Sequence, residues 1–128
     1  MKGLVDTSIF IAQEAGREIG QLPDEASISV ITIAELHVGV LRATDPKIRA
    51  QRLGTLARAE RDFEAIPIDA KVARVFATML AEARTEGKRP NVMDVWIAAT
   101  AVNTGLLSSL ATQTFARPKK PLINPSRI

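Results

Sequence analysis

Residues 2–12 read KGLVDTSIFIA, with an apolar run on each side of Asp6, Thr7 and Ser8. The run from Lys2 to Val5 predicts a short strand, and the apolar residues 9–12 predict the start of a helix. Between them, Asp6 and Thr7 are both suited to cap that helix, because a side-chain oxygen there accepts hydrogen bonds from the first turn. A strand that passes directly into a helix is typical of a parallel α/β sheet.

The alternation of strands and helices continues to about residue 111. Short stretches predict strands at 26–31, 63–68 and 106–111. Helices are predicted from Thr32, over 47–62, from Asp69, and from Asn91 to a stop at Gly105. Their expected inward positions are Ile33, Leu36, Val40 and Leu41; Ile48, Leu53 and Leu56; Val72, Val75, Phe76, Met79 and Leu80; and Val92, Val95, Trp96, Ala99 and Val102. We therefore expect an α/β protein with a parallel sheet covered on both faces.

Composition narrows the class of protein. The chain has 128 residues, of which 46% are hydrophobic and 24% are charged. These values fit one folded domain, since a domain usually has roughly 100–200 residues. It has no cysteine, which excludes thiol and Fe–S chemistry and suits a cytoplasmic location. Its single histidine, His37, argues against a zinc site or a Ser-His-Asp triad. We expect no membrane association, because no apolar stretch approaches the roughly 18 residues of a spanning helix.

The net charge of +3 is unevenly distributed. Residues 1–94 carry 13 Lys and Arg against all 14 Asp and Glu, whereas residues 95–128 carry four basic residues and no acidic one. From Arg117 on, three prolines within eight residues exclude a regular helix or a central strand. We therefore divide the chain into a domain over 1–115 and an atypical proline-rich basic tail over 116–128.

Three carboxylates lie where predicted strands end or predicted helices begin. Asp6 follows the first strand, Glu35 lies one turn into the next helix, and Asp94 lies one turn into the helix that Asn91 opens. Ligands of open α/β sheets bind beyond the carboxyl ends of the strands. Helix capping is the simpler explanation, since Asp6 is a good N-cap, Thr32-x-x-Glu35 has capping-box spacing and Asn91-x-x-Asp94 resembles it.

The surroundings of the three acids favour a common site. Each lies in an apolar segment, whereas caps are usually close to solvent. Carboxylates brought together there would repel one another unless a cation lay among them. Mg²⁺ or Mn²⁺ suits oxygen ligands, whereas zinc prefers nitrogen or sulfur, and such a centre activates water for phosphodiester hydrolysis. We therefore predict that Asp6, Glu35 and Asp94 are catalytic and bind the metal.

Three segments resemble the PIN domain and, more narrowly, the VapC-type toxins of bacterial and archaeal toxin–antitoxin pairs. They are Leu4-Val5-Asp6-Thr7-Ser8, Ile31-Thr32-Ile33-Ala34-Glu35-Leu36, and Asn91-x-x-Asp94 followed by Ile97-Ala98-Ala99. The resemblance covers residues 1 to about 115, in the order and with the spacing usual in the family.

The resemblance implies a Rossmann-like α/β/α sandwich and a Mg²⁺-dependent endoribonuclease that cuts single-stranded RNA. It also implies a homodimer held inactive by a VapB-type antitoxin, whose C-terminal segment covers the active site. Asp6 and Asp94 would be metal ligands, and Glu35 would bind the metal directly or through water. Thr7 would support the site by hydrogen bonding.

The chain departs from the family pattern after Asp94. Members usually carry a fourth acid in a segment resembling Thr-x-Asp-x-Asp-Phe, where this chain reads Leu110-Ala111-Thr112-Gln113-Thr114-Phe115. The threonine, Thr112, matches, but the acids and the expected closing strand are missing. Two explanations stay open: a genuine variant whose basic tail grips phosphates, or a shifted reading frame. The second is wrong if no other frame of the coding DNA restores an acid followed by an apolar strand.

The leading hypothesis is a toxin-like metal-dependent ribonuclease. Its main alternative is a catalytically impaired PIN domain that still dimerises and binds its antitoxin, because the fourth acid is missing. A third hypothesis, a receiver-like or phosphatase domain with Asp6 as phospho-acceptor, needs a late lysine, for which only Lys119 and Lys120 are available. Lys88 and Arg89, in the basic loop before the last helix, are candidates to hold a substrate phosphate near the metal.

Overall fold

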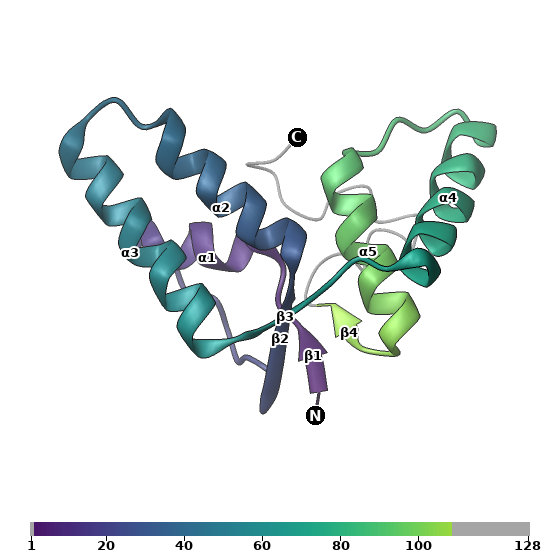
Figure 1. The fold of residues 1–128 in the computed structure, drawn as a ribbon, viewed down its shortest axis with the longest axis horizontal. Coiled ribbons are helices and arrows are strands. Elements are labelled where there is room, and N and C mark those ends of the chain that lie inside the picture. Colours follow the sequence, from purple (N-terminus) through teal and green to yellow (C-terminus); the bar gives the residue numbers. More distant parts are fainter. Residues whose placement is uncertain (1, 109–128) are drawn as a thin grey trace.

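Strands and helices alternate as the sequence predicts. The structure, a computed structural model, describes residues 2–108. Its elements in chain order are β1 (Lys2–Leu4), α1 (Thr7–Glu14), β2 (Glu25–Ser29), α2 (Val30–Arg42), α3 (Pro46–Asp62), β3 (Glu64–Ile66), α4 (Ala70–Thr85), α5 (Val92–Thr104) and β4 (Leu107–Ser108). Helices α1, α2 and α3 form one arm and α4 and α5 the other, with the strands between them (Figure 1). The predicted α/β/α sandwich is confirmed.

The sheet is parallel, with strand order β3-β2-β1-β4. The chain steps outward from β1 to β2 and β3, and then α4 and α5 carry it back to the far side of β1. Leu4, the last residue of β1, lies opposite Ser27 on β2 and Ser108 on β4. In parallel sheets, ligands bind where the strand order reverses in this way. The crevice expected for a ligand is therefore at the carboxyl end of β1.

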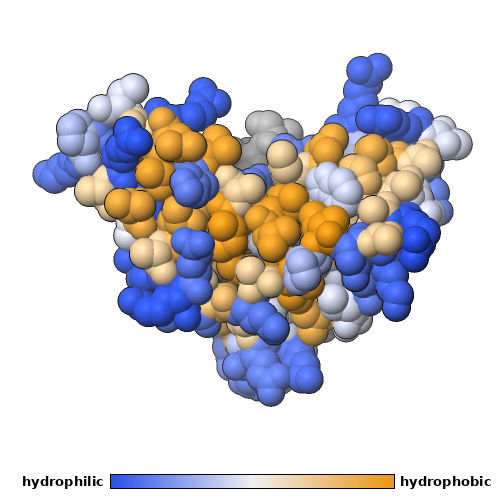
Figure 2. Space-filling view, in the orientation of Figure 1, coloured by the Kyte–Doolittle hydropathy of each residue, from blue (hydrophilic) through white to orange (hydrophobic). Residues whose placement is uncertain are grey.

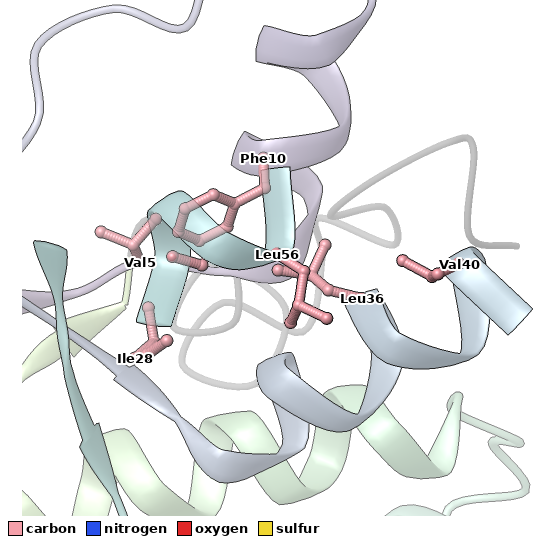
Figure 3. Close-up of a cluster of buried hydrophobic side chains, with 7 residues drawn as sticks. Val5, Phe10, Ile28, Leu36, Val40 and Leu56 are labelled. Carbon is pink, nitrogen blue, oxygen red and sulfur yellow. The ribbon is translucent and has the colours of Figure 1, made fainter. Parts of the chain in front are cut away.

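Two hydrophobic clusters flank the sheet. Val5 belongs to the cluster of the first arm, where it packs with Phe10, Ile28, Leu36, Val40, Leu56 and Ala59 (Figure 3). Its neighbour Leu4 belongs to the second cluster, with Ile97, Ala98 and Ala101 of α5. Successive side chains of extended backbone point to opposite faces, so this pair of residues anchors both arms.

Aromatic pairs join the helices within each arm. Phe10 and Phe63 meet edge to face, with ring centroids 5.3 Å apart and planes at 84°. In the other arm, Phe76 of α4 and Trp96 of α5 stack with centroids 3.6 Å apart and planes at 5°. The edge-to-face geometry is a favourable one for two aromatic rings, whereas rings stacked face to face gain mainly from the burial of their apolar surface. Phe76 and Trp96, both predicted to face inward, contact each other between α4 and α5.

Capping side chains set where the helices begin. Asp6, Asp45, Asp69 and Asn91 cap α1, α3, α4 and α5. For α2 the prediction is wrong, because the helix begins at Val30 and its cap is Ser29, whose Oγ accepts from the N–H of Ile31 at 3.0 Å. Thr32 and Glu35 therefore do not form a capping box.

Some helix positions predicted to face inward are exposed instead. They are Leu41, Ile48, Leu53, Val92 and Val102. For Leu41 the cause is the helical period, because it lies five residues after the buried Leu36 and so about 140° round the helix. On α2 the apolar stripe that reaches the core is therefore narrower than the one predicted.

Several predictions fall outside the described residues. These are the last strand beyond Ser108, the domain boundary at 115, Thr112, and the tail over 116–128. Within residues 2–108, the helices are too short or too polar for any of them to cross a membrane.

Leu56 and Leu53 of α3 make a matched test of the first cluster. Leu56 is 4% exposed and Leu53 is 54% exposed. We expect Leu56→Ala to lower the free energy of unfolding by about 2–5 kcal/mol, and Leu53→Ala to change it by about 0.5 kcal/mol or less. Urea unfolding followed by circular dichroism measures both, and equal losses would contradict the described packing of α3.

Candidate active site

Asp6 lies at the carboxyl end of β1 and begins α1. Its side chain is 1% exposed, and its Oδ2 accepts a hydrogen bond from the N–H of Ser8 at 3.0 Å. The sequence predicts this cap, and the structure confirms it. The positive end of the α1 dipole stabilises the negative charge of a carboxylate at this position. The first predicted site residue is therefore a buried carboxylate at the strand-order reversal.

Asp94 lies in the first turn of α5. Its side chain is 6% exposed, and its N–H donates to Asn91 Oδ1 at 3.2 Å. Because α5 leads directly into β4, which runs parallel to β1, the start of α5 lies at the carboxyl edge of the sheet. A second buried carboxylate is thus placed at a helix N-terminus on the same edge as Asp6.

Glu35, on the second turn of α2, is linked to the start of α1. Its Oε1 accepts a hydrogen bond from Thr7 Oγ1 at 2.6 Å. Thr7 is buried and follows Asp6 directly, so this bond brings the Glu35 carboxylate to the Asp6 turn. This hydrogen bond is the kind of contact that the supporting role predicted for Thr7 requires.

The three carboxylates share one edge but do not form a ready-made set of ligands. Within the described part of the chain, no three His, Cys, Asp or Glu side chains are grouped closely enough to hold a metal ion together. Mg²⁺ does not require such a cage, because it usually keeps several waters and binds one or two carboxylates. Two buried carboxylates, with Glu35 close to one of them, are a donor set of that kind.

The basic loop between α4 and α5 lines a cavity of about 520 Å³. Lys88 and Arg89 lie there as exposed side chains, and Lys88 Nζ is 2.9 Å from Glu86 Oε1. Arg84 of α4 also lines the cavity. Sequence reasoning missed it because a basic residue in a last helical turn is already explained by the helix dipole.

The turn after α4 gives this loop a defined shape. Gly87 has φ of +79°, a backbone conformation that glycine adopts readily. The N–H of Lys88 donates to the carbonyl of Ala83 at 2.8 Å, which closes the end of α4. Lys88 therefore projects from an ordered turn, three residues before Asn91, the cap of α5.

Two residues stand out in other ways. Thr32 contacts Thr7, with 2.9 Å between the two hydroxyl oxygens, and sequence reasoning missed it because it considered Thr32 only as a cap. His37 is exposed on α2, on a different side of the helix from Glu35, as its two-residue offset predicts.

Comparison with known proteins identifies the family. The PIN domain family matches residues 3–112, and the chain therefore belongs to the PIN-domain family. Ribonuclease VapC5 of Mycobacterium tuberculosis is 43% identical over 106 residues, which cover 81% of this chain and 78% of that protein. Ribonuclease VapC of Rickettsia bellii is 32% identical over 118 residues, 89% of this chain and 88% of that protein. Within the family, the chain is of the VapC type. PIN-domain ribonucleases generally depend on a divalent metal ion.

Solved structures agree with this assignment. The chain matches a crystal structure of VapBC-5, a member of the VapBC family of toxin–antitoxin systems from Mycobacterium tuberculosis, with a TM-score of 0.73 and 42% identity over 84% of this chain and 82% of that one. It also matches a toxin–antitoxin complex from Klebsiella pneumoniae, with a TM-score of 0.64 and 26% identity over 90% of this chain and 91% of that one.

The cap formed by Asp6 predicts how its variants fold. Asparagine caps a helix about as well as aspartate, whereas alanine does not. We expect Asp6→Asn to unfold at the same urea concentration as the wild type, and Asp6→Ala to lose about 1 kcal/mol. Equal losses in both variants would show that the cap to Ser8 does not stabilise the fold.

Proposed function

We propose that this chain is a metal-dependent endoribonuclease, the toxin of a type II toxin–antitoxin pair. The observation that carries the proposal is the pair of buried carboxylates, Asp6 and Asp94, at two helix N-termini on the carboxyl edge of the sheet. The relatives named ribonuclease VapC support the same activity.

Mg²⁺ is the proposed metal, with Mn²⁺ as a substitute. Asp6 and Asp94 hold it, and Glu35 binds it directly or through water. When bound, the ion activates water and stabilises the charge that develops on the scissile phosphate. Helix caps fix both acids: the Asp6 carboxylate accepts from the backbone N–H of Ser8, and the backbone N–H of Asp94 donates to the side chain of Asn91.

Other residues around the three acids have supporting roles in this proposal. Thr7 holds Glu35 through the 2.6 Å hydrogen bond. Lys88 and Arg89, together with Arg84, bind phosphates of the RNA backbone in the cavity that they line. Thr112, which lies outside the described residues, is the remaining supporting candidate, because it matches the threonine of the family pattern. Cellular RNA as substrate implies a cytoplasmic location.

The proposed partners are a VapB-type antitoxin and a second copy of the chain. The solved relatives include VapBC-5 and other toxin–antitoxin complexes. Exposed apolar side chains supply surface for protein partners, and Figure 2 shows apolar surface over the middle and the first arm of the face in view. The exposed apolar residues of α2, α3 and α5 include Val38, Leu41, Leu53, Val92 and Met93.

One observation favours a second candidate function. No acidic residue follows Asp94 in the sequence, so the fourth acid usual in the family is missing. A catalytically impaired PIN domain that still dimerises and binds its antitoxin would have this sequence. Wild-type protein that binds the antitoxin but leaves RNA intact at every Mg²⁺ concentration would support it over the nuclease.

Removing either buried carboxylate should abolish cleavage. We expect Asp6→Asn and Asp94→Asn to lower the rate of RNA cleavage by about 100-fold or more, since changes even beyond the direct ligands cost 10–100-fold. EDTA should have the same effect on the wild type, and Mg²⁺ should reverse it. Asp45→Asn is the matched control, because Asp45 also caps a helix but lies at the start of α3. Wild-type cleavage by Asp94→Asn would exclude the assignment.

The basic loop should contribute RNA affinity that depends on salt. In an Asp94→Asn background without divalent metal, we expect Arg84→Gln and Arg89→Gln each to weaken binding of single-stranded RNA. Removing one phosphate contact should reduce the slope of log K against log salt by about 0.7. Fluorescence anisotropy measures both effects. Arg49→Gln, an exposed change on α3, should leave the slope unchanged, and equal slopes in all variants would place the RNA elsewhere.

A further inference from the structure

We infer that Thr32 is a positioning residue of the acidic site, acting on Glu35 through Thr7. The inference rests on the proposed function only in taking Glu35 as part of the site. Its basis is a buried chain of hydroxyl contacts that joins the starts of α1 and α2.

The number of protons on the two threonine hydroxyls determines which hydroxyl donates to the other. Thr7 Oγ1 donates to Glu35 Oε1 at 2.6 Å and lies 2.9 Å from Thr32 Oγ1. A threonine hydroxyl has one proton to donate and two lone pairs to accept with. Because the Thr7 proton points to Glu35, the proton between the two hydroxyls belongs to Thr32. Thr32 therefore donates to Thr7, and Thr7 donates to the carboxylate.

The hydroxyl of Thr32 differs from those of four other helical threonines. Thr78, Thr85, Thr100 and Thr104 each donate to the carbonyl four residues earlier, at 2.8–3.1 Å. This local bond is the ordinary choice of a threonine within a helix. Thr32 is the third residue of α2, so the residue four positions earlier lies in β2 and not in the helix. Its hydroxyl contacts another element instead.

Burial makes these contacts persistent. Thr32 is 0% exposed and Thr7 is 1% exposed, so water does not readily replace either partner. A buried hydroxyl without a partner is unfavourable, and this opposes any side-chain rotation that breaks the contacts among Thr32, Thr7 and Glu35. Thr32 and Glu35 are three residues apart and so on neighbouring positions of one helix face. Thr7 is thus held between two side chains of α2.

The expected effect of this arrangement is a restricted Glu35 side chain. A glutamate has three rotatable side-chain bonds and loses considerable rotamer freedom when it is held in place. With Thr7 fixed by Thr32, the carboxylate is already oriented before a metal ion arrives. Less of the metal-binding free energy is then lost in ordering the ligand.

The test compares isosteric variants of two buried threonines. Thr32→Val removes the hydroxyl and Thr32→Ser keeps it. Thr100→Val is the matched control, since Thr100 is also 0% exposed but donates to its own helix. In metal-free protein, ¹³C relaxation of the Glu35 side chain should show lower order in Thr32→Val and wild-type order in Thr32→Ser and Thr100→Val. Mn²⁺ binding without RNA should weaken by up to about tenfold in Thr32→Val alone.

The outcomes separate the inference from the proposed function. Unchanged Glu35 order in Thr32→Val, or lower order in Thr32→Ser, overturns the positioning role whatever the nuclease does. If Thr32→Val does not fold, Thr32→Ala, which also removes the hydroxyl, takes its place and should lower the order of the Glu35 side chain. Absence of RNA cleavage and of Mn²⁺ binding in the wild type would overturn the proposed function, while the relaxation measurement would still decide whether Thr32 orders Glu35.

Discussion

β1 lies between β2 and β4, and both hydrophobic clusters and the shared edge of the sheet follow from this placement. This strand supplies Leu4 to one hydrophobic cluster and extends into Val5 of the other, and it is where the chain's path reverses across the sheet. Because all strands are parallel, the starts of α1, α2 and α5 lie at one edge. The buried acids follow from this arrangement, since the helix starts bring them to that edge.

Capping a helix and belonging to the proposed site are compatible roles for Asp6. The sequence offered these as competing explanations of Asp6, but the carboxylate caps α1 through Ser8 and is also buried at the strand-order reversal. Capping uses one of the two carboxylate oxygens of Asp6, so it does not remove the negative charge of the side chain. Serine caps a helix equally well but carries no charge, so the proposed metal site explains why an acid suits this position. Ser29, by contrast, caps α2 with an uncharged side chain.

The sequence predicts the order of the elements and the location of the acids well, because hydrophobic period and capping residues are local signals. Asp6, Asp69 and Asn91 begin helices as predicted. What it cannot predict depends on contacts between segments distant in the chain. The bond from Thr7 to Glu35 spans 28 positions, and Thr32 was interpreted by spacing alone although its partner lies in another helix. Leu53 is a similar case, since its exposure depends on where neighbouring helices pack.

The stacked pair of Phe76 and Trp96 has a practical consequence. Trp96 is the chain's single tryptophan, and the chain has no tyrosine, so its near-ultraviolet emission comes from one indole. That indole lies two residues after Asp94 and against α4. The emission of Trp96 can therefore report changes near Asp94, within one helical turn, in protein that carries no label.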